Sequence, residues 1–394
     1  MQQLTFKFFS VLILLMVFKV VKAQQQPINV VTTAVPFLRI SPDARAGGMG
    51  EVGIATLPDA NSGFWNLAKT PFNTNQGGLS LTYTPWLKKL GLGDVYLASM
   101  AGYYKLDDKQ AISGSLRYFS LGRIQFTNER GEDIKSSSPR EFSIDGGYTR
   151  KLSEKVGLGL ALRYINSSLA TGDFSGTTYK PGSTVAADIS LYYTNPHEDG
   201  SGLSLGGVLS NLGGKIGYTT DAKQKDYIPA DLGLGAAYTK VYDENNKITF
   251  ALDLHKLLVP TPPLLTTDDN VNTANIAKYR NKSVVSSWLS SFGDAPGGGS
   301  EELKEVQLSA GAEYWYNDQF ALRAGYFYED KTKGNRKYFT LGFGLKYNVF
   351  GLNFSYIIPS GNGISQNPLS NTLRFGLVFD FNGENSTSSS SGTQ

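Results

Sequence analysis

The chain has 394 residues, with 37 Lys and Arg against 34 Asp and Glu, 44 Gly, 22 Tyr, 22 Phe and no Cys. The lack of Cys excludes disulfides and thiolate metal sites, and the near balance of charge gives no basic excess of the kind that nucleic-acid-binding proteins carry. A composition this rich in Gly and aromatic residues leaves two classes, a secreted β protein and a β-barrel of the outer membrane.

Residues 1–23 have the form of a secretory signal peptide. Lys7 precedes an apolar run over residues 8–18, and a small-residue cleavage site ends at Ala23. The run is too short for a permanent membrane helix. We therefore expect an exported mature chain in which acidic and basic residues are equal in number, because lysines are the only charged residues that the signal removes.

The next segment, residues 24–76, contains Gly48-Met49-Gly50-Glu51-Val52-Gly53, which has the G-x-G-x-x-G spacing of a dinucleotide-binding loop. Such a loop needs a strand before the first Gly, a helix after the last and an acidic residue about 20 positions on. Residues 40–45 have no strand pattern, Pro58 interrupts the following run, and residues 66–79 carry no Asp or Glu. A nucleotide site is not expected, so the glycines need another role.

From residue 77 onward, apolar residues recur at every second position, which is the period of a strand with two different faces. About fourteen such segments follow one another, each near the 9–11 residues that a tilted membrane-spanning strand needs. The predicted strands lie around residues 77–84, 94–105, 111–126, 140–151, 156–164, 185–193, 202–210, 231–241, 246–255, 304–316, 319–329, 337–347, 350–358 and 370–381.

The connections between these strands alternate between tight turns, such as residues 317–318, and long loops, such as 122–139 and 256–300. Outer-membrane barrels have this asymmetry because their periplasmic turns are short and their extracellular loops are long. A soluble sandwich, the alternative, has no reason to alternate so regularly. We predict an all-β fold, a 14-stranded antiparallel transmembrane β-barrel over residues 77–381, with both termini periplasmic and the long loops outside the cell.

Residues 24–76 lack sustained alternation, and we expect them to fold back as an N-terminal plug. A barrel of this strand number has a lumen wide enough to need filling. Glycines permit tight turns and close packing against the wall, and charged side chains can pair with the polar inner faces of strands. The residues expected in the plug are Pro36, Arg39, Asp43, Arg45, Gly47, Gly48, Gly50, Trp65 and Asn66. Residues 382–394, rich in Ser, are expected to form a disordered periplasmic tail.

Three stretches resemble a known family. They are PFLRISPDARAGGMG at residues 36–50 with its continuation to residue 69, ALDLHKLLVPTPP at 251–263, and SFGDAPGG at 291–298. Together they resemble PorV, a family of outer-membrane barrels of the type IX secretion system that has the fold of the FadL long-chain fatty-acid transporters. The sequence departs from the family pattern at Leu67, where Pro is usual.

The resemblance implies a shuttle. PorV-like proteins receive cargo by its C-terminal signal domain as it leaves the secretion translocon, and deliver it to a surface attachment complex that contains a sortase-like transpeptidase. The alternative function is a FadL-like channel for hydrophobic small molecules, and modification of lipopolysaccharide is a fainter third possibility. The partners expected are therefore the translocon, cargo signal domains, the attachment complex and membrane lipid or lipopolysaccharide, and not nucleic acid.

The long loop over residues 256–300 separates the first two functions, since a shuttle needs an exposed docking surface and a channel needs an apolar pocket that meets the plug. Its apolar residues lie on a Pro-stiffened stretch and in a possible short amphipathic helix over residues 284–292. Exposed apolar surface of that kind often marks a binding site. The candidate partner-binding residues are Leu257, Leu258, Val259, Pro260, Trp288 and Phe292. A cap over the barrel mouth is the alternative role for both segments.

Catalytic chemistry is not indicated. The two histidines, His197 and His255, are too far apart in sequence to suggest a ligand pair. Acidic pairs such as Asp107-Asp108 fall in predicted loops, where solvated charge is the usual role. We therefore expect no enzyme activity, no cofactor and no metal site.

Overall fold

The computed structural model describes residues 28–87, 91–127, 129–174, 176–221, 225–358 and 371–381. The predicted signal peptide, the predicted C-terminal tail and most of the last long loop lie outside these ranges.

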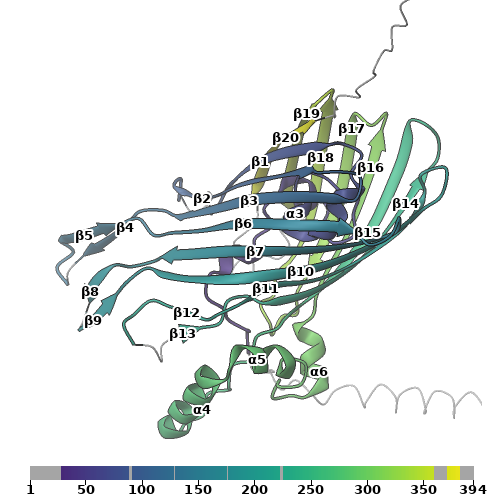
Figure 1. Cartoon of the computed structure of the whole chain (residues 1–394). Helices are drawn as coiled ribbons and strands as arrows, with labels where there is room; N and C mark the ends of the chain where they lie inside the picture. Colours follow the sequence, from purple (N-terminus) through teal and green to yellow (C-terminus); the bar gives the residue numbers. More distant parts are fainter. Residues whose placement is uncertain are drawn as a thin grey trace, which may run out of the picture.

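Within the described residues, fourteen antiparallel strands close into one barrel, which confirms the predicted fold class (Figure 1). Each strand pairs with the next one along the wall, and β1 pairs with β20, with Gly77 opposite Phe381, to complete the ring. The strands are β1 (Gly77–Pro85), β2 (Val95–Lys105), β3 (Gln110–Leu121), β6 (Arg140–Lys151), β7 (Val156–Ser168), β10 (Gly182–Pro196), β11 (Gly202–Gly213), β14 (Asp231–Val241), β15 (Asn246–Leu257), β16 (Gln307–Tyr316), β17 (Phe320–Tyr328), β18 (Lys337–Tyr347), β19 (Phe350–Ile358) and β20 (Leu373–Phe381).

Three long connections carry short hairpins of their own. They are β4 (Ile124–Thr127) with β5 (Asp133–Ser137), β8 (Gly172–Phe174) with β9 (Thr177–Tyr179), and β12 (Ile216–Gly217) with β13 (Lys225–Asp226). The strand predicted over residues 111–126 is therefore wrong at its end. Gly122 has a φ of 81°, a left-handed conformation that favours Gly, and it separates β3 from β4.

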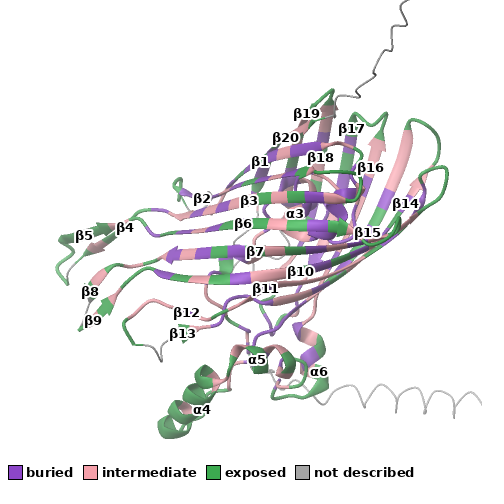
Figure 2. Cartoon of the chain, in the orientation of Figure 1, coloured by how far each residue is buried: buried purple, intermediate pink, exposed green. Residues whose placement is uncertain are grey.

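Buried and exposed residues alternate along the strands (Figure 2). The exposed outer face is apolar and the inner face is polar, the reverse of a soluble β protein. In β7, Leu160, Leu162 and Tyr164 are exposed on the outside, whereas Arg163 is buried on the inside. An apolar outer band of this kind is what lipid covers in an outer-membrane barrel. No helix among the described residues has the length and apolar character of a membrane span.

The barrel has two different ends. Six short turns, at residues 106–109, 152–155, 197–201, 242–245, 317–319 and 348–349, lie with Gly77 and Phe381 at what we call the short-turn end. The long connections lie at the opposite, long-loop end. There the connection after β15 forms α4 (Asp269–Asn281), α5 (Val284–Ser290), α6 (Gly299–Glu302) and the 3-10 helix η4 (Leu303–Glu305), which stand below the barrel in Figure 1.

Residues 28–76, the N-terminal segment, run through the barrel from one end to the other. The segment contains η1 (Pro36–Arg39), α2 (Ala44–Gly47), α3 (Ser62–Trp65) and η2 (Leu67–Phe72). It starts at the long-loop end, where the Asn29 amide donates to the Thr332 carbonyl at 3.1 Å, and it leaves at the short-turn end, where the Gln76 amide donates to the Phe381 carbonyl at 2.9 Å.

The expected placement of both termini in the periplasm stays a prediction, but the path of the segment bears on its N-terminal half. An even number of strands puts Gly77 and Phe381 at the same end, but it does not constrain the chain before the first strand. Asn29 and Ala34 hydrogen-bond to residues of the long connections, Thr332 and Tyr227, so the first described residues lie at the end opposite to Phe381.

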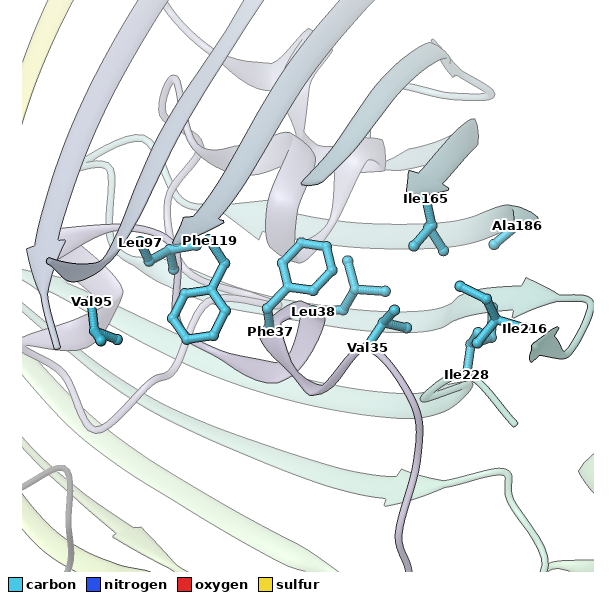
Figure 3. Packing of buried hydrophobic residues seen from close by; sticks show 10 residues of the cluster. All are labelled: Val35, Phe37, Leu38, Val95, Leu97, Phe119, Ile165, Ala186, Ile216 and Ile228. Carbon is cyan, nitrogen blue, oxygen red and sulfur yellow. The ribbon is translucent and has the colours of Figure 1, made fainter. Parts of the chain in front are cut away.

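The largest apolar core lies between the N-terminal segment and the inner wall near the long-loop end (Figure 3). Phe37 and Leu38 of η1 are buried there against Leu97 of β2, Phe119 of β3 and Ile165 of β7. These inward apolar side chains interrupt the polar inner face only where the N-terminal segment covers them.

Candidate functional site

The glycines of the G-x-G-x-x-G stretch lie against the barrel wall. Gly48 follows α2, and a Cβ on Gly48 would lie 2.8 Å from the Gly342 Cα of β18. Gly50 has a φ of 70°, and a Cβ there would lie 2.6 Å from the Tyr326 nitrogen of β17. Because the segment entering Gly48 is a helical turn and not a strand, the dinucleotide-loop geometry is absent. The glycines allow backbone to pack directly on backbone.

Arg45, just before these glycines, is bound by carboxylates of the wall and of its own segment. Its Nε and Nη2 donate to the two carboxylate oxygens of Glu313 on β16 at 2.9 and 2.7 Å, and its Nη1 donates to Asp59 at 2.9 Å. Arg323 of β17 donates to the same Glu313 at 2.6 Å, beneath the ring of Trp315. Buried charges are tolerated when they are paired in this way.

A second wall carboxylate, Asp253 of β15, binds the backbone of the segment. It accepts hydrogen bonds from the amides of Gly53 and Ile54 at 2.7 and 2.9 Å. The buried Lys69 ammonium donates to the Gly53 carbonyl at 2.6 Å and to Thr56. The loop over residues 53–56 is thus fixed from both sides by charged groups.

The predicted residues Asp43, Trp65 and Asn66 connect the helical turns of the segment to each other. The Trp65 indole donates to the Asp43 carboxylate at 2.6 Å, and Asp43 also caps α2 by accepting from the Ala46 amide. Asn66 donates to the Ile54 and Leu191 carbonyls, each at 3.0 Å. Asn66 also accepts from the Ala68 amide, so the turn in which Leu67 replaces the usual Pro is capped.

The remaining predicted residues of the segment lie in different surroundings. Gly47 is buried so close to Arg374 of β20 that a Cβ would lie 2.8 Å from its guanidinium. Arg39 is half-buried and lies 3.5 Å from the Glu329 carboxylate near the long-loop end. Pro36 is exposed and lines a pocket at that end. The sequence analysis did not identify the wall residues that bind the segment. The signal that could have identified them is a charged residue on the inner face of a strand.

The long connection after β15 is fixed at its base by buried ion pairs. Lys256 donates to Glu302 and Glu305 at 2.9 and 2.8 Å, and Lys333 from the next long connection donates to Glu305 at 2.9 Å. Burial alone would raise the pKa of Glu305, but hydrogen bonds from Lys256, Lys333 and Thr261 outweigh it and hold that pKa below its ordinary value.

Four of the predicted docking residues, Leu257, Leu258, Val259 and Pro260, are buried, so the exposure expected for them is wrong. The cause is the N-terminal segment and a neighbouring loop, which cover this stretch. Leu257 and Val259 form a core cluster with Val31 and Tyr227, against which Tyr279 of α4 packs.

The expected short helix over residues 284–292 is present as α5, and it does expose apolar side chains. Val285, Leu289 and Phe292 are 60%, 76% and 53% exposed, and their spacing puts them on one side of the helix and its end. Trp288 is half-buried. We call Val285, Leu289 and Phe292 the α5 face.

The residues with catalytic potential, two histidines and one serine, lie in structural positions. His255 lies 2.7 Å from Asp231 inside the barrel, and His197 lies in a short turn. Residues 202–206 have the spacing G-x-S-x-G, but they lie within β11, and Ser204 hydrogen-bonds to Tyr192 and Thr194. A nucleophile elbow would require a turn from strand to helix. In the described part of the chain, no group of three or more His, Asp or Glu is arranged to hold a metal ion.

Comparison with models of protein families decides to which family the chain belongs. The family model described as "Type IX secretion system protein PorV" matches residues 21–264, which include the N-terminal segment and the strands through β15. The chain belongs to the PorV family. This makes it an outer-membrane β-barrel protein associated with type IX secretion. The α5 face lies beyond the matched range.

Solved structures show a similarity of fold alone. The chain is similar to the toluene transporter TbuX of Ralstonia pickettii, with a TM-score of 0.51 and 10% identity over 86% of this chain and 97% of that one. The Pseudomonas putida toluene transporter TodX gives a TM-score of 0.47 and 11% identity over 86% and 98% of the two chains. A Pseudomonas aeruginosa FadL homologue gives 0.44 and 10% over 90% and 99%. No curated protein matches the chain.

Proposed function

We propose that this PorV-family barrel is a docking and shuttle protein of type IX secretion. It binds the C-terminal signal domain of cargo leaving the translocon and passes the cargo to a surface attachment complex with a sortase-like transpeptidase. The long-loop end faces the cell exterior and the short turns face the periplasm, as in outer-membrane barrels generally. The N-terminal segment acts as a plug.

The observation that carries this proposal is the exposed α5 face on a firmly held loop. Lys215 donates to the carbonyls of Arg280 and Lys282 at 2.5 and 2.7 Å, and Tyr227 donates to the Lys282 carbonyl at 2.8 Å, just before α5. An apolar face held in place loses little conformational entropy on binding, which favours its use as an interface.

The tight packing of the N-terminal segment supports its role as a plug. The two pockets that lie between the segment and the inner wall around Arg45 and Trp65 have volumes of about 360 and 110 Å³, too small to pass a folded protein. Passage of a protein or a large solute through the lumen would therefore require the segment to move. A shuttle that works through its outer loops needs no such movement.

Affinity purification from outer membranes tests the docking proposal. The variant Leu289→Ser/Phe292→Ser should assemble as a barrel but retain at least about tenfold less translocon and cargo signal domain, the loss typical of removing interface anchors. The matched control is Val271→Ser on α4 with Leu303→Ser on η4, two residues that are also exposed at the long-loop end. Normal capture by the α5 variant would move the docking surface to another loop.

The alternative function, a channel for hydrophobic small molecules, draws support from one further observation. A mainly apolar pocket of about 630 Å³ lies between the N-terminal segment and the long connections. Uptake of labelled toluene or fatty acid by cells with and without the protein would test this function. Uptake that depends on the protein, together with unaffected secretion, would favour the channel over the shuttle.

A further inference from the structure

The pocket of about 630 Å³ at the long-loop end has a lining that indicates a more specific ligand than either function above requires. Its apolar walls come from Val35 of the N-terminal segment, Phe119 and Leu121 of β3, Leu169 just after β7, and Ile276 of α4. Its volume falls in the range of small-molecule sites, about 300–1,000 Å³. The walls alone would accept many apolar ligands.

One charged side chain in the lining restricts that choice. Glu141 of β6 is only 1% exposed, yet it lines the pocket. It accepts a hydrogen bond from the Ser167 hydroxyl at 2.6 Å, and Ser167 in turn accepts from the Tyr218 hydroxyl at 3.0 Å. No Lys, Arg or His among the described residues contributes an attractive charge to Glu141.

The other charges around the pocket are at its rim. Arg280 lies 3.9 Å from Asp226, and both side chains are more than two-fifths exposed. This pair is largely neutral as a unit and is screened by solvent. Among the described residues, the pocket therefore presents a buried carboxyl group without a counter-ion beside its apolar walls.

We infer that this pocket binds a small amphiphile whose apolar chain ends in a protonated amine. A buried carboxylate is unfavourable unless a cation joins it. An alkylammonium supplies that cation and hydrogen-bond donors while its chain covers the apolar walls. A fatty acid of the same length would bring a second carboxylate to Glu141, and like charges in a buried site repel.

Calorimetric titration of the full-length protein in lipid nanodiscs tests this inference with three probes of one chain length. Decylamine should bind to the wild type, while decanol should bind more weakly and decanoate not detectably. Glu141→Gln should lower the affinity for decylamine by at least about tenfold, the effect of losing one charged hydrogen bond, and leave decanol little changed. Empty nanodiscs correct for partition into lipid.

Two further variants keep the test decisive. Asp108→Asn, in an exposed short turn at the other end, removes the same charge and should leave decylamine binding unchanged. Leu169→Trp, which fills the pocket from a partly exposed position, should weaken decylamine and decanol alike. The inference is overturned if decanoate binds as well as decylamine, or if neither Glu141→Gln nor Leu169→Trp changes decylamine binding. Secretion tests on the α5 face do not depend on this result.

Discussion

Arg45 and Glu313, which are 268 residues apart in sequence, form a two-point ion pair between the N-terminal segment and the barrel wall. Glu313 is fully buried and also pairs with Arg323, so it faces two guanidinium groups. Its removal would leave two buried cations, of which Arg45 would keep a direct ion pair with Asp59. The pair therefore fixes the segment to the wall at Arg45.

We predict that Glu313→Gln destabilises the folded barrel by about 3–5 kcal/mol, the usual effect of removing one partner from a buried pair. The measurement is the denaturant midpoint for loss of the heat-modifiable form on gels. Asp318→Asn is the control, since Asp318 pairs with Lys247 but is 70% exposed and should contribute about 0–1 kcal/mol. Equal midpoints for both variants would contradict the importance of the buried pair.

We predict that deletion of residues 30–70 opens the barrel. Contacts from Arg45, Gly53 and Asn66 to the wall would be lost, and the polar inner face would become a water-filled lumen. Single-channel conductance in planar bilayers should rise well above that of the full chain. The matched control removes the β4–β5 hairpin, which lies outside the lumen, and should leave the barrel closed. A closed barrel after the N-terminal deletion would refute the plug.

The barrel could be predicted strand by strand because each strand repeats the same contrast between an apolar and a polar face. In β7 that contrast extends from Leu158 to Tyr164, and the structure confirms it. The wrong end of the strand predicted over residues 111–126 came from Gly122, whose left-handed backbone leaves no trace in hydropathy. The strand predicted over 304–316 starts only at Gln307, because η4 occupies its first residues. Helix α4 was not predicted because none of its residues is buried, so its sequence has no apolar period.

The site could be predicted only in part. Arg45 and Asp43 were expected to pair with other groups, but their partners depend on register across the barrel and not on local sequence. Leu257 and Val259 read as exposed because they are covered by Val31, more than 200 positions away, and by Tyr227 of another connection. Helix α5 was expected because its period lies within one helix, but of the α5 face only Phe292 was among the candidate docking residues.

We predict that an epitope tag inserted after Gln26 is accessible on the same side of the membrane as a tag in the β4–β5 hairpin. The reason is that Asn29 and Ala34 are hydrogen-bonded to long connections. A tag appended after Phe381 should be accessible only after the outer membrane is permeabilised. Antibody binding to intact and permeabilised cells measures both. An N-terminal tag that is hidden on intact cells, with the hairpin tag visible, would contradict the path described for the segment.

The last prediction concerns the pH dependence of the long connection that carries α5. Because the pKa of Glu305 is lowered in the folded protein, its ion pairs contribute stability that is fully present above its ordinary pKa and is lost as pH falls through the lowered value. The connection should therefore be held firmly at neutral pH and released below about pH 4. Pepsin digestion from about pH 5 down to about pH 2 should show a steep rise in cleavage between residues 264 and 300, normalised to a peptide substrate at each pH.

Glu305→Gln cannot titrate, so its connection should be cleaved readily even at about pH 5, and the rise should be smaller. Glu301→Gln is the matched control, since Glu301 is more exposed and contacts Lys333 but not Lys256. A wild-type rate that follows only the activity of the protease, with no difference between the two variants, would mean that the Glu305 pairs do not hold the loop.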